Sequence, residues 1–370
     1  MLLSTIIKQF ADSFRHRYAK NLLPGHTKAL ESMAGCRHEH GPHMLAQCAN
    51  HQCDTTAYIP HSCGHRNCPH CQNHESQQWI EQQLSKRLPC QYYLITFTLP
   101  EQLRDLAWKN QKTVYSLMFV TVQDLLKSFT KNDKKLGGAP GFTAVLHTQT
   151  RSLDYHPHIH VVMPGASINM QTSLWRVKSP GYLFSHKALA KVFRDRFLQA
   201  LKENKLPIPH DCPKQWVVDC KEAGNGDQAL VYLGRYLYRG VIREKDILHC
   251  RDGMVTFRYR HAKSGEDRTR TVTGEYFLYL LMLHVLPRGF RRARSYGFLH
   301  SCSKKLILFL QMVLRVVPWR SLARNMKKQR PAIICPACGA AMVIVATMLF
   351  HRHRPVRPDC TGRAAEVLGM

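Results

Sequence analysis

Hydrophobic and polar positions along the chain predict long helices separated by short strands. Residues 1–34 fit two short helices that end at Gly35, and residues 75–87 fit a polar helix. Apolar residues recur every three or four positions in 186–204, as expected for a helix with one buried face. Similar patterns predict further helices over about 101–131 and 227–240.

The predicted strands are short and rich in β-branched and aromatic residues. They are 91–98, 142–148, 158–163, 214–219, 246–250 and 254–259. Asp252-Gly253 separates the last two and is a typical hairpin turn. Separated strands and long helices together favour an α+β fold, with helices flanking a central antiparallel sheet.

The charge of the chain points to a polyanionic partner. Lys and Arg number 53 against 25 Asp and Glu, which gives a net charge of +28 and an isoelectric point near 9.8. This excess is far larger than solubility requires, so it favours nucleic-acid binding over a general solubility role. The sequence has no apolar run of about 18 residues and no clear secretory leader, so we expect a soluble, cytoplasmic protein.

Cysteines cluster near the N-terminus. Six of the 14 lie between positions 36 and 71, which favours metal binding over disulfides in a chain without a secretory leader. Two close pairs separated by a loop resemble the spacing of a zinc ribbon, and they predict one structural Zn²⁺ held by Cys48, Cys53, Cys68 and Cys71.

Two further metal arrangements stay open. A second zinc site could be formed by Cys36, His43, Cys63 and His65. The same residues could equally support the ligands of the first site or be exposed to solvent. Near the C-terminus, Cys335-x2-Cys338 is one more knuckle-like pair. Its partners would come from His351, His353 or Cys360.

The sharpest motif for chemistry is His156-Pro157-His158-Ile159-His160. Alternate residues of a strand share a face, so His158 and His160 point the same way while Ile159 points into the core. Two imidazoles on one face bind a divalent ion and leave positions open for substrate and water. His156 shares their parity but precedes Pro157 at the strand edge. Two surface histidines are the alternative interpretation.

A second candidate lies in the helix predicted over 227–240. Tyr232 and Tyr236 are four residues apart and share one helical face, with Arg235 and Arg239 in a stripe beside them. A tyrosine hydroxyl can attack a phosphodiester and hold the DNA as a phosphotyrosine, while arginines hold flanking phosphates. The alternative is that both tyrosines are ordinary core aromatics.

These motifs occur in a characteristic order. A cysteine module, a His-hydrophobe-His strand and a Tyr-x3-Tyr helix resemble the two-tyrosine HUH rolling-circle transposases of bacterial insertion sequences, the IS91 family. The resemblance covers about residues 10–300. Besides the histidine and tyrosine motifs, it rests on residues 62–71, on Leu286-Pro287-Arg288-Gly289-Phe290 and on Arg294-Ser295-Tyr296-Gly297-Phe298.

The resemblance implies roles for these residues. His158 and His160 correspond to ligands of the catalytic Mg²⁺ or Mn²⁺, and Tyr232 and Tyr236 to the nucleophiles. The implied reaction nicks single-stranded DNA at a transposon end, forms a 5′-phosphotyrosine and transfers the strand to target DNA by a rolling-circle-like route. No nucleotide cofactor or small-molecule substrate is implied. Two candidates for a third metal ligand are Gln228 and His147.

On this basis the chain divides into four parts. We expect N-terminal helices in 1–35, a zinc-binding domain in 36–74, an HUH nickase domain in 90–275 and a basic, mainly helical DNA-binding region in 276–370. The last part has no acidic residue between Glu275 and Asp359, against 15 Lys and Arg.

Aromatic residues lie among the arginines at the start of this basic region, a pattern that suits single-stranded DNA. The candidate DNA contacts are Arg288, Arg291, Arg292 and Arg294. A solvated basic face is the alternative interpretation.

Three other functions are compatible with the sequence. A replication initiator or a relaxase would use the same HUH chemistry on a plasmid origin. A non-catalytic zinc protein that binds DNA would form no covalent adduct, and neither would an inactive transposase copy. The zinc module and the segment 286–290 favour a transposase, which we expect at the bacterial nucleoid.

Overall fold

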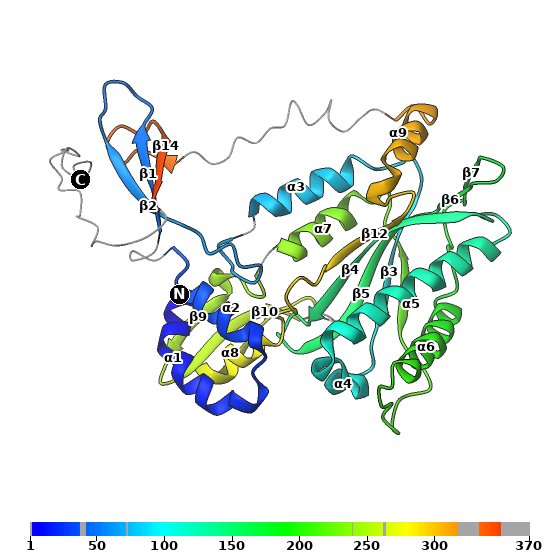
Figure 1. The fold of residues 1–370 in the computed structure, drawn as a ribbon, viewed down its shortest axis with the longest axis horizontal. Coiled ribbons are helices and arrows are strands. Elements are labelled where there is room, and N and C mark those ends of the chain that lie inside the picture. Colours follow the sequence, from blue (N-terminus) through cyan, green and yellow to red (C-terminus); the bar gives the residue numbers. More distant parts are fainter. Residues whose placement is uncertain are drawn as a thin grey trace.

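The computed structural model describes residues 2–37, 42–71, 73–238, 240–261, 264–316 and 333–348. They form three antiparallel sheets with helices around them (Figure 1), which confirms the predicted α+β class. His351, His353, Cys360 and Arg239 lie outside the described residues.

The helices are α1 (Leu3–Tyr18), α2 (Pro24–Ala34), α3 (Asn73–Leu84), α4 (Arg104–Lys109), α5 (Gln111–Asn132), α6 (His186–Glu203), α7 (Asp227–Tyr238), α8 (Gly274–Met282) and α9 (Lys304–Val313). The strands of the first half are β1 (His43–Cys48), β2 (Thr56–Pro60), β3 (Tyr92–Thr98), β4 (Ala139–Gln149), β5 (Tyr155–Pro164), β6 (Ala166–Asn169) and β7 (Leu174–Val177). Those of the second half are β8 (Val218–Glu222), β9 (Ile247–Arg251), β10 (Met254–Arg260), β11 (Asp267–Thr273), β12 (Ala293–Gly297), β13 (Ile333–Ile334) and β14 (Ala341–Met348).

Most predicted elements agree with these bounds, and three do not. The helix expected over 101–131 is interrupted at Asn110, whose backbone leaves helical geometry between α4 and α5. The strand expected over 214–219 is β8, which begins at Val218. The described part of the C-terminal region, expected to be mainly helical, contains α8 and α9 and also three strands, β12, β13 and β14.

The largest sheet has seven strands in the order β7-β6-β4-β5-β3-β8, with β12 paired to β4. Different helices cover its two faces (Figure 1). Ile159, Val161 and Met163 of β5 face α5 and α6, whereas Val162 faces α3 and α7. His158 and His160 therefore lie on the face that α3 and α7 cover. Because β12 belongs to this sheet, the boundary expected at residue 275 would cut through it.

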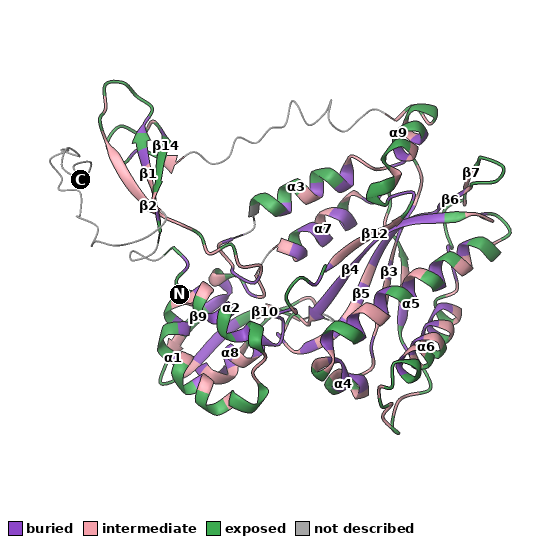
Figure 2. Ribbon diagram, viewed as in Figure 1, coloured by how far each residue is buried: buried purple, intermediate pink, exposed green. Residues whose placement is uncertain are grey.

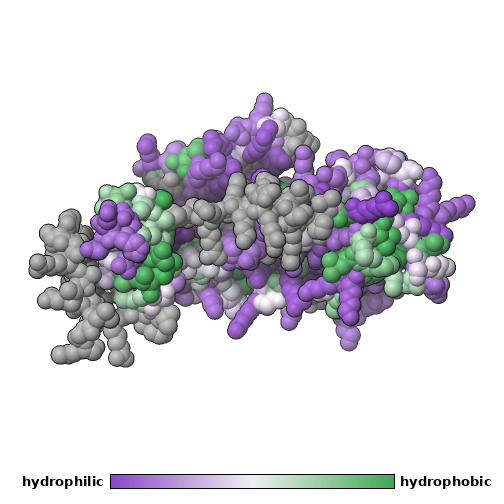
Figure 3. Space-filling model, turned by 90° about the horizontal axis from the view of Figure 1, so that it is seen from above, coloured by the Kyte–Doolittle hydropathy of each residue, from purple (hydrophilic) through white to green (hydrophobic). Residues whose placement is uncertain are grey.

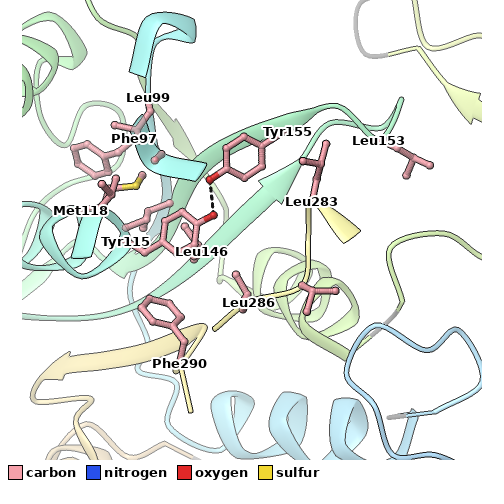
Figure 4. Packing of buried hydrophobic residues seen from close by; sticks show 14 of the residues in the cluster. Phe97, Leu99, Tyr115, Met118, Leu146, Leu153, Tyr155, Leu283, Leu286 and Phe290 are labelled. Atoms are coloured by element: carbon pink, nitrogen blue, oxygen red, sulfur yellow. Dashed lines mark hydrogen bonds between the residues drawn. The ribbon is translucent and has the colours of Figure 1, made fainter. Parts of the chain in front are cut away.

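The two ends of the segment 286–290, Leu286 and Phe290, lie in the core. Figure 4 shows Leu286 and Phe290 beside a hydrogen bond between the hydroxyls of Tyr115 and Tyr155. Leu286 and Phe290 are each only 7% exposed. Two residues of this segment, on which the family resemblance partly rests, therefore have a packing role, and they join the chain after α8 to the large sheet.

Two smaller sheets complete the fold. β9, β10 and β11 form a three-stranded sheet, in a lobe in which α8 packs on α1 (Figure 1). The predicted hairpin between β9 and β10 is present, with Asp252 and Gly253 at φ 49° and 75°. The other sheet has the order β13-β14-β1-β2, so it joins the segment 43–60 to the segment 333–348.

Burial and polarity follow this arrangement. Figure 2 shows buried residues concentrated in the large sheet and on the helix faces turned toward it. The surface seen in Figure 3 is mostly hydrophilic. Nowhere in the described part of the chain is there a helix with the length and apolar character needed to cross a membrane.

Candidate functional site

Three histidines meet on the face of the large sheet that α7 covers. His158 and His160 come from β5, and His147 comes from β4, directly opposite His158 in the strand register. One ring nitrogen of each lies within 4.8 Å of the others. The structure thus brings the predicted pair together and adds His147, while Gln228 lines the cleft beside them.

The environment of these imidazoles favours their neutral form. Burial lowers the pKa of His158 to about 4 and that of His160 to about 3, and it holds the pKa of His147 well below its usual value. The Nδ1 atom of His158 donates to the carbonyl of His156 at 2.6 Å, so its Nε2 carries the lone pair. Neutral imidazoles with a free lone pair are metal ligands.

The donor set fits a divalent transition-metal ion. The Nε2 atom of His147 is buried and has no hydrogen-bond partner among the described residues, so it is available to an ion. The Nδ1 atom of His160 is 2.9 Å from Thr96 Oγ1, which orients that ring. The cluster offers three imidazole nitrogens and no carboxylate, a set that favours transition-metal ions over Mg²⁺.

Close packing on α3 fixes the position of α7. A Cβ atom on Gly234 would lie 2.2 Å from Ile80 Cγ1, so a larger residue does not fit between the two helices. The Gly234 carbonyl also accepts a buried hydrogen bond of 3.0 Å from Ser76 Oγ. Glycine within the Tyr232-to-Tyr236 turn therefore sets where both tyrosines lie over the sheet.

The two tyrosines differ in accessibility. Tyr232 is 47% exposed, and its ring centroid is 6.0 Å from those of His147 and His160. The ring of Tyr236 stacks on His147 at 3.3 Å, and its buried hydroxyl makes no well-formed hydrogen bond to a described residue. Burial raises the pKa of both phenols, to about 12 for Tyr236. Both side chains line the cleft described below, but Tyr232 is the more exposed of the two, whereas the Tyr236 hydroxyl is buried in this conformation.

Arg292 lies behind Tyr236 and does not face solvent. Its guanidinium is 5.3 Å from the Tyr236 ring centroid, and Nη1 donates to the carbonyl of Leu237 at 3.4 Å. The residue is 8% exposed and forms no ion pair within the described residues. The backbone carbonyl of Arg292 accepts from the amide of Leu146 at 2.9 Å, which places this residue beside β4.

A cleft of about 1100 Å³ opens beside the histidines and Tyr232. One wall comes from β4, β5 and α7, and the other from the segment 240–246 and from β10 and β11. Six cationic residues line it against two acidic ones, Asp246 and Asp267. The cations are Arg151, Arg235, Arg243, Lys245, Arg258 and Arg260. The excess of cationic over acidic side chains gives the cleft the charge expected of a polyanion-binding site.

The predicted DNA-contacting arginines are divided by the structure. Arg235 lines the cleft. Arg288 and Arg291 are exposed but do not line it. Arg292 is buried, so its assignment as a surface DNA contact is wrong for this conformation. The guanidinium of Arg294 packs over the rings of Phe119 and Phe290, at 4.1 Å and 5.4 Å.

Five of the six cleft cations were not predicted from the sequence. Arg258 and Arg260 alternate on β10, so they share a face of the hairpin. This alternation could have identified Arg258 and Arg260 from the sequence, but it is a weaker signal than the charge pattern of the C-terminal region. Arg151 and Arg243 lie in loops and Lys245 in a short 3-10 helix (Glu244–Asp246), whose positions no local pattern predicts.

Eight cysteines form two groups of four. In the first, the Sγ atoms of Cys36 and Cys71 are 3.7 Å apart and those of Cys36 and Cys68 are 3.5 Å apart. Cys63 completes the group, at 3.7 Å from Cys71. Four thiolates at about 2.3 Å from a tetrahedral zinc ion lie roughly 3.8 Å from one another, so this group fits such an ion.

The second group contains Cys48, Cys53, Cys335 and Cys338. The predicted set of Cys48, Cys53, Cys68 and Cys71 is therefore not brought together, and neither His43 nor His65 belongs to either group. The reason is the hairpin β1–β2. Cys48 and Cys53 lie at its tip, whereas Cys36 and Cys63 flank its base, and six residues of strand separate tip from base by about 17 Å.

Comparisons with known proteins agree with these parts. Residues 6–99 match the family described as "Transposase zinc-binding domain", and residues 141–306 match the family described as "Putative transposase". The first range contains the six N-terminal cysteines, and the second contains the histidine cluster, both tyrosines and all the residues that line the cleft. Cys335 and Cys338 lie outside both ranges.

Two relatives align over most of the chain. The putative transposase y4qJ of Sinorhizobium fredii is 30% identical over 92% of this chain and 93% of its own length. The transposase for insertion sequence element IS801 of Pseudomonas savastanoi pv. phaseolicola is 26% identical over 81% of this chain and 78% of its own length. A copper-bound structure of the conjugative relaxase TRWC with ORIT DNA aligns over 40% of this chain and 65% of that chain, at 15% identity and a TM-score of 0.26, which is too low to support a conclusion.

Proposed function

This chain belongs to the IS91 family of transposases, and we propose that it nicks single-stranded DNA at transposon ends through a tyrosine nucleophile. The observation that carries the proposal is the position of Tyr232, exposed in a basic cleft and beside three neutral histidines. A nucleophile, a candidate ion site and a channel for a polyanion thus occupy one place. Strand transfer at a target site, by a rolling-circle-like route in the bacterial cytoplasm, completes the proposed activity.

The proposed reaction begins at Tyr232. Its phenol oxygen attacks the scissile phosphorus, the bond from phosphorus to the 3′ oxygen breaks, and a 5′-phosphotyrosine and a free 3′-hydroxyl result. The phenol loses its proton to water, and the leaving oxygen takes one up. Arg151 opposes the effect of burial on the pKa of Tyr232, which favours loss of the proton.

His147, His158 and His160 would hold the divalent ion. Bound there, a Mn²⁺ or Mg²⁺ ion would polarise the scissile phosphate. The histidines are held in place relative to one another by adjacent strands and by contacts to Thr96 and the His156 carbonyl.

Tyr236 is proposed as the second nucleophile. In this conformation its hydroxyl is buried and its ring stacks on His147, so the side chain must move before it can act. Arg292 behind the ring counteracts the rise of its pKa. We therefore place Tyr232 first in the reaction and Tyr236 second, when a new strand end has to be cut or accepted.

The cleft cations would direct the DNA strand toward Tyr232. Arg235 lies about one turn after Tyr232 and directly precedes Tyr236 on α7, and the far wall supplies Arg258 and Arg260. Contacts to phosphates give affinity without sequence specificity. Structural zinc at Cys36, Cys63, Cys68 and Cys71 would hold the base of the N-terminal hairpin.

A covalent-adduct assay tests this function. Protein is mixed with end-labelled single-stranded DNA carrying the element terminus and Mn²⁺ or Mg²⁺, and separated on a denaturing gel. We expect a metal-dependent adduct that Tyr232→Phe and His158→Ala/His160→Ala remove. The matched control Tyr238→Phe, on the same helix but outside the cleft, should retain it. A DNA-binding protein that forms no adduct with several termini would be a non-catalytic zinc protein or an inactive copy.

A further inference from the structure

The second group of cysteines brings together Cys48 and Cys53 from the N-terminal part of the chain and Cys335 and Cys338 from the C-terminal part. The Sγ atoms of Cys48 and Cys338 are 3.4 Å apart, and those of Cys53 and Cys335 are 3.8 Å apart. All four thiols lie within 4.8 Å of one another. These separations are close to the edge of roughly 3.8 Å in a tetrahedral zinc-thiolate site. The Cys48–Cys338 contact spans 290 positions of sequence.

The backbone around these thiols has the form of two facing knuckles. The amide of Cys335 donates to the carbonyl of Ala340 at 2.8 Å, and the amide of Gly339 donates to the carbonyl of Cys335 at 3.0 Å. Gly339 has a φ of 72°, a conformation that favours glycine. On the other side, the Asn50 amide donates to Cys48 Sγ at 3.4 Å. Both turns direct their thiols to the same point.

The small sheet around this group has little apolar core of its own. Its buried hydrophobic cluster consists of four residues, two of which are themselves ligand candidates: Ala46, Cys48, Cys335 and Met342. A core of this size does not stabilise four strands without a covalent or metal cross-link. The described cysteines form no disulfide, and thiolate sets of this kind suit Zn²⁺.

We propose that Cys48, Cys53, Cys335 and Cys338 bind a second structural zinc ion, which fastens strands β13 and β14 to the hairpin β1–β2. The site is distinct from the first group of thiols, which lies at the other end of the hairpin. It goes beyond the proposed nicking activity and does not depend on it. Through it, the segment 333–348 becomes part of the N-terminal zinc module.

Zinc content of the full chain tests the proposal. The measurement uses the His158→Ala/His160→Ala background, so that the histidine cluster contributes no ion. We expect Cys48→Ser/Cys53→Ser and Cys335→Ser/Cys338→Ser each to lose one zinc per chain. The variant with all four substitutions should also lose one, because the pairs share a single ion. The control Cys250→Ser/Cys302→Ser, outside both groups, should lose none.

Every other result overturns the proposal. Full zinc content in either pair variant would mean that the pair is not a ligand set. Loss of two ions from the fourfold variant would mean two separate sites with other partners. Loss of both ions from one pair variant would mean that the two groups are not independent, as the structure requires them to be.

Hydrogen exchange provides a second readout at a distance. The amides of β14 pair with β1 in the register His43–Met348 to Cys48–Met342. If one ion fastens the two segments, Cys48→Ser/Cys53→Ser should remove protection from 341–348 as fully as Cys335→Ser/Cys338→Ser does. Unchanged protection of 341–348 in the N-terminal variant would contradict a shared ion.

Discussion

Replacing Gly234 with alanine should displace α7 and, with it, both tyrosines. The added Cβ would lie 2.2 Å from Ile80 Cγ1 and 2.9 Å from Trp79 Cε3. Carbon atoms in contact are about 3.5 Å apart or more, so one helix must move by roughly 1 Å. Ile80 is buried and branched at Cβ, so it cannot turn aside at low cost.

The expected loss of stability is small compared with the loss of activity. Overpacking of a core costs about 1–3 kcal/mol, and alanine recovers about 1 kcal/mol over glycine in a helix interior. The net destabilisation is therefore about 0–2 kcal/mol, which leaves the protein folded. A misplacement of about 1 Å at a reacting group can cost roughly 100-fold in rate. Adduct formation should fall by about that factor.

Urea unfolding and single-turnover adduct formation measure the two effects separately. Gly25→Ala in α2 is the matched control, because its Cβ would lie 3.6 Å from Val285 Cγ1, an ordinary contact. It should leave the adduct rate unchanged. Adding Ile80→Ala to Gly234→Ala should restore part of the rate. A wild-type adduct rate in folded Gly234→Ala would refute the view that α3 packing positions the tyrosines.

Three further outcomes are expected. Arg292→Gln should lower the amount of DNA adduct on Tyr236 several-fold more than the amount on Tyr232, as measured by quantifying the two modified peptides. An equal loss of both adducts would point to a general folding role. Arg258→Ala/Arg260→Ala should weaken single-stranded DNA binding at low salt, and Arg288→Ala should not. In titrations at several salt concentrations, the double variant should reduce the slope of log affinity against log salt concentration by about 0.7 for each phosphate that is no longer neutralised. Calorimetry should show tighter binding of Mn²⁺ than of Mg²⁺ to the histidine cluster, since its donors are all imidazoles, and a preference for Mg²⁺ would contradict that donor set.

Short-range patterns made much of the site predictable. The parity of His158 and His160 follows from strand geometry alone, and the four-residue spacing of Tyr232 and Tyr236 follows from helix geometry. His147 was one of two candidates, and only the register of β4 against β5 brings it opposite His158. The different exposure of the two tyrosines depends on how α7 lies on the sheet, which no local pattern encodes.

Long-range pairing accounts for what could not be predicted. The cysteine pairs were matched by proximity in sequence, but the hairpin β1–β2 carries Cys48 and Cys53 away from Cys68 and toward the C-terminal pair. Likewise, the charge pattern identified Arg292 as exposed, but the strand that follows it inserts beside β4 and encloses the side chain. Each error concerns an interaction between segments far apart in sequence, whose register is set by the whole fold.

The proposed mechanism requires that Tyr232 attacks DNA while the histidine cluster holds the ion. The most direct measurement is mass spectrometry of the covalent adduct after digestion with nuclease and protease. We predict a nucleotide phosphate on the peptide containing Tyr232, formed only with a divalent ion and absent from His158→Ala/His160→Ala. Adduct located first on Tyr236 would contradict the proposed order. Intact, DNA-bound protein with neither tyrosine modified would contradict the mechanism itself.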